Sequence, residues 1–255
     1  MSALTAGHQP AWRIPRPPLQ DWLFITLCGW GALLLGVVLV GNLIDHWSWI
    51  ASLFGREVTD VSVTYSIWSV MAGIAIWYVG FVGGYYLHNY LPAFVAAGRT
   101  RRISAIEAGI FCGVISLVGA VLVTLGYLWE RVVYAIAGWS RGTPDETILY
   151  FSFNDYGRIL ITEVLTMTMW IVGGAFIGSA FYRSNFRGAI AIAIALIAVN
   201  IVGGNSGLGA PTTFFTRQLD LSPGLPLTFV VTTVSIAVLG VLTWWNVKDV
   251  PLRNK

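Results

Sequence analysis

The chain has 255 residues, of which 56% are hydrophobic and only 11% are charged, and its formal net charge is +3. A soluble domain carries roughly 25% charged residues because its surface must face water, so this composition excludes an ordinary soluble protein. With a mean hydropathy of +0.72, most of the apolar surface is expected to face lipid.

The chain begins with a polar segment, 1–21, that is rich in proline. These prolines argue against a long regular helix before about Leu19. The apolar run that starts at Trp22 is too long for the core of a cleaved signal peptide, so we expect it to stay as a membrane span.

Six apolar runs approach the length of about 20 residues that a helix needs to cross the hydrocarbon. The predicted spans are residues 22–43, 66–88, 105–129, 159–182, 188–204 and 226–246. The sequence therefore predicts an all-α integral membrane protein, multi-pass in the cell membrane. It consists of an N-terminal segment 1–21, a six-helix domain 22–246 and a tail 247–255.

Charge predicts the orientation of these spans. Ten of the 15 arginines and lysines fall in the two terminal segments and in the links after the second and fourth spans. The positive-inside rule then places both termini and both links in the cytoplasm. Tryptophans near span ends are expected to be interfacial anchors, among them Trp68, Trp129, Trp244 and Trp245.

Glycine pairs spaced by four residues recur in three of the predicted spans. They are Gly80/Gly84, Gly109/Gly113 and Gly174/Gly178. Because this spacing lets helix backbones approach closely, the pairs indicate a packed bundle and are compatible with a dimer.

Patterns of known membrane enzymes are missing from the sequence. A GxSG pattern at Gly204–Gly207 would need a histidine base, but His46 and His88 are predicted on opposite sides of the membrane. No P-loop and no zinc-protease histidine pair occur. We therefore expect no catalytic, cofactor or metal site in this chain, and energy must come from a partner, a gradient or the substrate.

Charge within the spans is limited to Glu107 and Glu163. We expect Glu107 to pair with Arg101 or Arg102 near the cytoplasm, and Glu163 to pair with Arg158 at the outer edge. Transporters coupled to ion gradients usually hold ionisable groups at the midplane, so this pattern disfavours gradient coupling.

The link 89–104 between the second and third spans has an unusual pattern. Pro92 suits a first helical turn, and Leu91, Phe94 and Val95 share one face, which predicts a short amphipathic helix. Gly98 is expected to end it before the basic residues. The segment fits either a groove on a soluble partner or the surface of an anionic membrane.

The run from Leu91-Pro92 to Gly98-Arg99-Thr100-Arg101-Arg102 resembles the first cytoplasmic loop of type-2 ABC export permeases. That family has six spans and both ends inside. The resemblance implies that the loop is a coupling helix, which docks on a separate ATPase subunit that binds ATP and Mg. The residues implied in this role are Leu91, Pro92, Phe94, Val95, Gly98, Arg99, Arg101 and Arg102.

The same resemblance implies a second permease copy, identical or related, with a pathway between the first, second and fifth spans. Trp30, Phe81, Tyr85 and Tyr86 are the candidate pathway residues, and they would suit an amphipathic or hydrophobic substrate. The family also often has re-entrant helices, which segment 205–225 could hold.

The sequence-based hypothesis is an ABC exporter permease whose partners are the ATPase, the second copy and the lipid bilayer, with no nucleic acid. Two alternatives stay open. A membrane sensor or assembly protein would use the same loop without transport, and a gradient-driven transporter would depend on Glu107 or Glu163.

Overall fold

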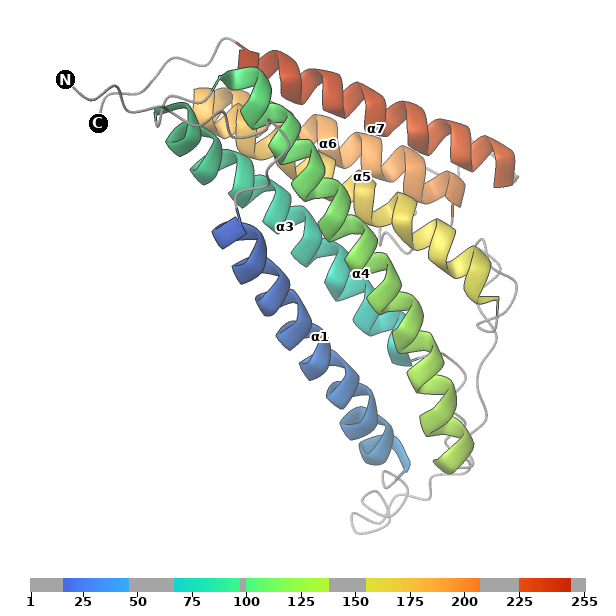
Figure 1. Ribbon diagram of the computed structural model, residues 1–255. Helices are drawn as coiled ribbons and strands as arrows, with labels where there is room; N and C mark the ends of the chain where they lie inside the picture. Colours follow the sequence, from blue (N-terminus) through green and yellow to red (C-terminus); the bar gives the residue numbers. More distant parts are fainter. Residues whose placement is uncertain (1–15, 46–66, 97–99, 138–154, 207–224, 249–255) are drawn as a thin grey trace, which may run out of the picture.

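The computed structural model describes residues 16–45, 67–96, 100–137, 155–206 and 225–248, and these contain helices and no strand. The all-α prediction is therefore confirmed for this part of the chain. Figure 1 shows its six helices as a bundle. They are α1 (Arg16–Asp45), α3 (Ile67–Ala96), α4 (Arg101–Ala137), α5 (Tyr156–Arg183), α6 (Asn185–Ser206) and α7 (Leu225–Lys248).

Four of the described helices are long and apolar enough to cross a membrane. By length and composition, the stretches are Leu19–Leu39, Arg101–Ile136, Tyr156–Arg183 and Phe229–Lys248. The described apolar stretch of α6, Asn185–Val199, is shorter, and α3 is rich in Trp, Tyr and Gly. These findings indicate a membrane protein, while spans through α3 and α6 stay predictions.

The helix α1 begins earlier than the prolines led us to expect. Its first residue is Arg16, three residues before Leu19, and Pro17 and Pro18 lie in its first turn. The first turn of a helix has N–H groups without intrahelical partners, so proline, which has no N–H, can be accommodated there.

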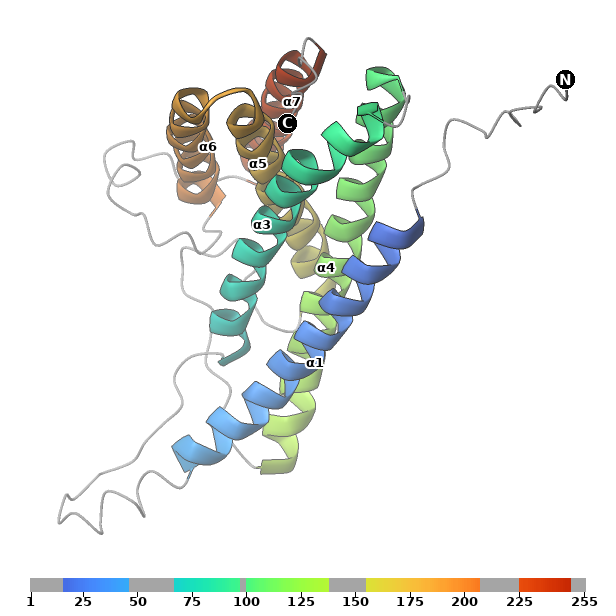
Figure 2. The ribbon, with the colours of Figure 1, turned by 90° about the vertical axis from the view of Figure 1, so that its left-hand side faces the viewer.

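The link between the second and third predicted spans is shorter than expected. Residues 89–96 continue α3 without a break, so this segment is not a separate short helix. Pro92 lies within α3, and Figure 2 shows the last turns of the helix bending toward α4. A proline inside a helix removes one hydrogen bond and commonly bends the axis.

The helix α5 lies at the centre of the bundle. It packs against α3, α4, α6 and α7, whereas α1 contacts only α3 and α4 among the described helices. Figures 1 and 2 show α1 along the outer side of α4, away from α6 and α7. Among the four candidate spans α5 is the most buried, so the contacts of α5 determine how the rest of the bundle is arranged.

Two of the three glycine pairs form a close contact between α3 and α5, which we call the glycine seam. A Cβ atom added at Gly174 would collide with the carbonyl oxygen of Gly80, and one added at Gly178 would collide with that of Gly84. The expected backbone approach is therefore confirmed here. In contrast, a Cβ at Gly109 or Gly113 would meet no atom within 4 Å.

Trp68 is not an interfacial anchor but a fully buried residue that joins α3 to α4. Its backbone N–H donates to Oε1 of Glu130 at 2.8 Å, and its indole N–H donates to the carbonyl of Val123 at 2.8 Å. The ring of Trp30 on α1 contacts it, with ring centroids 5.4 Å apart. The carboxylate thus satisfies one of the unpaired N–H groups at the start of α3.

At the opposite end of α4, four basic residues gather around the end of α7. A guanidinium N–H of Arg101 donates to the carbonyl of Lys248 at 3.0 Å, and one of Arg183 donates to the carbonyl of Trp245 at 3.5 Å. Together with the exposed Arg102, these residues form what we call the basic end of the bundle. Cations are favourable at a helix C-terminus, where carbonyl groups lack partners.

Candidate functional site

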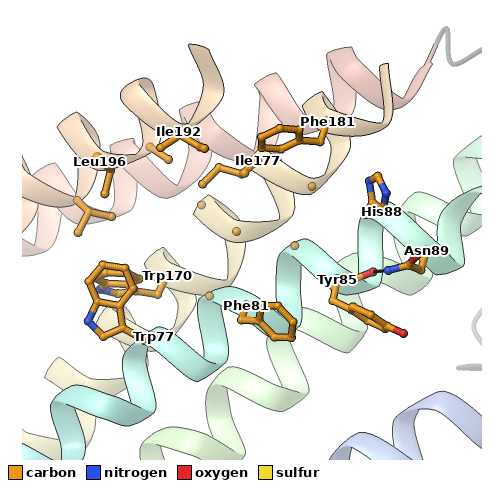
Figure 3. Close-up of a pocket in the computed structure, with 17 residues that line it drawn as sticks. Trp77, Phe81, Tyr85, His88, Asn89, Trp170, Ile177, Phe181, Ile192 and Leu196 are labelled. Atoms are coloured by element: carbon orange, nitrogen blue, oxygen red, sulfur yellow. Dashed lines mark hydrogen bonds between the residues drawn. The ribbon is translucent and has the colours of Figure 1, made fainter. Parts of the chain in front are cut away.

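A cleft of about 680 Å³ lies between α3, α5 and α6, and no described residue of α1 lines it. Figure 3 shows its large side chains. Those from α3 are Trp77, Phe81 and Tyr85, those from α5 are Trp170, Ile177 and Phe181, and those from α6 are Ile192 and Leu196. We call this feature the aromatic cleft. Its volume is that of a site for a small molecule.

The glycine seam makes the floor of the aromatic cleft. Gly80 and Gly84 of α3, and Gly174 and Gly178 of α5, all line it. Because these residues have no side chains, α3 and α5 meet backbone to backbone and leave space above the contact. The glycines at which the two helices make contact therefore also account for the hollow between them.

The side chains that form the walls of the cleft are largely aromatic, and several of them are exposed. The rings of Trp77 and Trp170 meet edge to face with centroids 4.6 Å apart, which joins the walls from α3 and α5. Phe81 is 65% exposed and Trp77 is 56% exposed. Large apolar rings exposed in a hollow provide contact area for an apolar ligand or for another membrane helix.

One end of the cleft is polar. His88 and Asn89 line it there, and both are exposed. The amide of Asn89 donates to the backbone carbonyl of Tyr85 at 3.1 Å, and the ring of His88 lies edge-on to Tyr182. The cleft therefore combines an apolar body with hydrogen-bonding groups at the end nearer the C-terminus of α3.

Of the four predicted pathway residues, two line the cleft and two do not. Phe81 and Tyr85 are part of its wall. Tyr86 is buried and stacks on Phe111 with centroids 4.0 Å apart, and Trp30 is buried against α3. Tyr85 therefore lines the cleft, whereas the neighbouring Tyr86 packs in the core.

The most prominent wall residues were missed by sequence reasoning. Trp77, Trp170 and Phe181 resemble any other aromatic residues of a membrane helix when only the sequence is considered. The available signal was the pair Gly80/Gly84 together with Gly174/Gly178, because residues beside a close helix contact surround whatever hollow it leaves.

The apolar residues of the predicted coupling segment do not lie on an exposed face, as we had expected. Leu91 is buried in the core of the bundle, and Phe94 packs against that core through the rings of Tyr86 and Tyr90. Val95 is partly buried. The apolar face that we expected to meet a partner thus packs inside the chain's own bundle.

The basic part of the same segment lies at the surface. Arg102 is exposed, whereas Arg101 donates a hydrogen bond to the end of α7. Gly98 and Arg99 lie outside the described residues, as does segment 207–224, where re-entrant helices were expected. Ala93 is exposed on the last turns of α3.

The carboxyl groups inside the helices do not all have the expected partners. Glu163 is buried within α5, and its Oε2 has no hydrogen-bond partner among the described residues. Arg158, which we expected to pair with it, forms an ion pair with Asp155 at 3.1 Å. Asp155 also accepts a hydrogen bond from the backbone N–H of Arg158, and thereby caps the start of α5.

Searches of protein-family models, of curated proteins and of solved structures found no match to this chain. Within the described residues, no group of three or more His, Cys, Asp or Glu side chains is placed to hold a metal ion.

Proposed function

We propose that the chain is the transmembrane permease subunit of an ATP-driven exporter, which moves an amphipathic or hydrophobic substrate out of the cytoplasm or inner leaflet. The observation that carries the proposal is the aromatic cleft, an exposed apolar hollow with His88 and Asn89 at one end. In this proposal the protein crosses the cell membrane several times, with both termini in the cytoplasm.

The chemistry of the cleft matches an amphipathic substrate. An apolar body would rest on the glycine floor and stack against Trp77 and Phe81, whose rings provide a large contact area. A polar head would accept or donate hydrogen bonds at His88 and Asn89. Because the cleft is open on one side, a second permease copy would enclose it. Movement of the two copies relative to each other would then expose the cleft alternately to the two sides of the membrane.

A separate ATPase would supply the force at the end of α3. Since α3 runs unbroken from Ile67 to Ala96, a push on its last turns would move the same helix that forms one wall of the cleft. The glycine seam would pass that movement to α5. The docking surface in this proposal is the exposed Ala93 on the last turns of α3, and not the buried Leu91.

The coupling part is tested by placing a bulky side chain on the docking surface. Ala93→Arg should abolish co-purification of the ATPase and substrate-stimulated ATP hydrolysis, while the chain still inserts into the membrane. The matched control is Ala189→Arg, an exposed alanine of α6 near the same end of the bundle. If native pull-downs contain no ATPase, or if Ala93→Arg behaves like its control, ATP coupling through this link is wrong.

The cleft part is tested by transport in vesicles containing the reconstituted complex. Phe81→Ala should lower uptake of an apolar fluorescent amine several-fold. Phe229→Ala removes a ring of the same size, also exposed, from α7 outside the cleft, and should not lower it. Equal uptake by the two variants would show that the cleft is not the substrate site.

Glu163 supports a second candidate, a transporter driven by an ion gradient. Burying an ionisable group inside a membrane helix costs free energy, so such groups usually mark functional positions. The Oε2 of this buried carboxyl has no hydrogen-bond partner among the described residues. Glu163→Gln would then abolish transport that persists without any ATPase. For the ATP-driven exporter, the same substitution should leave substrate-stimulated ATP hydrolysis intact.

A further inference from the structure

A second groove, of about 580 Å³, lies between α4, α5 and α7, and it shares no lining residue with the aromatic cleft. Its lining includes Ile106, Gly109, Cys112 and Gly113 of α4, with Gly240 and Trp244 of α7. Arg102 also lines it. We call it the basic groove, and its role does not depend on the transport proposal.

The floor of the basic groove is open and is not a packed helix contact. A Cβ atom added at Gly109, Gly113 or Gly240 would meet no atom within 4 Å. The glycines of the seam behave in the opposite way, since a Cβ at Gly174 would collide with α3. The three glycines of the groove therefore leave a hollow that the chain itself does not fill.

The charge around the groove is positive at one end. Arg102 is exposed there, beside the guanidinium groups of Arg101 and Arg183 that bind the last carbonyls of α7. The ammonium of Lys248 lies 3.8 Å from the centroid of the Trp245 ring. No Asp or Glu is among the residues that line the groove. An anion at this end would therefore meet Arg102 and no lining carboxylate.

The length of the groove along α4 matches the thickness of one leaflet of a bilayer. From Arg102 to Gly113 the helix advances about 16 Å at its usual rise per residue. The hydrocarbon of a bilayer is about 30 Å thick, so one leaflet contributes about half of that. The groove thus presents charge where the headgroups lie and an apolar channel where an acyl chain lies.

We propose that the basic groove binds an anionic phospholipid. Its phosphate would lie against Arg102, which can donate two parallel hydrogen bonds to phosphate oxygens. One acyl chain would run along Gly109 and Gly113 toward the middle of the membrane. Basic pockets between membrane helices are known to recognise anionic headgroups by this combination of charge and apolar contact.

Native mass spectrometry of the full chain in detergent tests this assignment. The protein is titrated with phosphatidylglycerol and with phosphatidylcholine that carry identical acyl chains. We expect tighter binding of phosphatidylglycerol, and Arg102→Gln should weaken it about five-fold, equivalent to about 1 kcal/mol. Arg187→Gln removes the same charge from an exposed site on α6 outside the groove, and should leave binding unchanged.

A second pair of variants tests the acyl channel. Gly113→Leu places a side chain in open space, so the helix tolerates it while the groove is filled, and both lipids should bind less. Gly31→Leu is the control, at a glycine of α1 that is equally open but distant from the groove.

Three results would overturn the proposal. One is equal binding of the two lipids, and another is an equal loss for Arg102→Gln and Arg187→Gln. The third is a shift from dimer to monomer in Gly113→Leu with lipid binding unchanged, which would assign the groove to a second copy of the chain.

Discussion

The glycine seam makes a quantitative prediction for Gly174→Ala. The added Cβ would overlap the carbonyl oxygen of Gly80, and backbone cannot rotate away as a flexible side chain can. Overpacking of this kind costs about 1–3 kcal/mol, and a backbone neighbour places the cost toward the upper end of that range. The preference of a helix for alanine over glycine offsets about 1 kcal/mol of this cost. We therefore expect the free energy of unfolding to fall by about 2 kcal/mol.

Gly31→Ala is the matched control for this substitution. At Gly31 the new Cβ meets nothing within 4 Å, and alanine is favoured over glycine in a helix by about 0.8–1.0 kcal/mol. The two variants should therefore differ by about 3 kcal/mol in opposite directions. Unfolding in mixed micelles of rising dodecyl sulfate content, followed by tryptophan fluorescence, measures the difference. Equal midpoints would refute the close contact between α3 and α5.

Three further predictions concern single contacts. Glu130→Ala should lower the free energy of unfolding by about 1–3 kcal/mol, since it leaves the buried N–H of Trp68 unpaired, and Glu130→Gln, which keeps an acceptor oxygen, should lose less in the same unfolding assay. Arg101→Ala should cost about 0.5–1.5 kcal/mol and speed hydrogen exchange in the last turn of α7, whereas unchanged exchange would exclude the capping role. Gly188→Ala should displace the ring of Phe181 and lower the affinity of the aromatic cleft for an apolar fluorescent probe, whereas unchanged affinity would show that this ring does not shape the cleft.

The fold was predictable where it follows from hydropathy alone. All six apolar runs lie in helices in the described part of the chain. Long apolar runs favour helices because a helix pairs the backbone groups within its own segment. The end of α3 was not predictable in the same way. Pro92 indicated the first turn of a separate short helix, but α3 continues through it, with Leu91 in the core of the bundle and Phe94 packed against that core.

The aromatic cleft was only partly predictable, for a physical reason. A sequence shows which helix face is apolar, but in a membrane protein both the lipid-facing and the core-facing sides are apolar. Tyr85 and Tyr86 are thus equivalent in the sequence, although one lines the cleft and the other stacks in the core. Trp68 was misplaced for the same reason, since a tryptophan near a span end can anchor at the interface or bury its ring.

The connection between α5 and α6 explains why the cleft can coexist with a tightly packed bundle. The hydroxyl of Ser184 accepts the backbone N–H of Arg187, and the backbone N–H of Ser184 donates to the carbonyl of Ala180, so the turn is held at both ends. A Cβ at Gly188 would collide with Phe181, which means that α6 leaves the turn close against α5. The cleft is therefore bounded by one helix contact made of glycine and one tight turn, and its width depends on how α3 and α6 diverge from α5 between them.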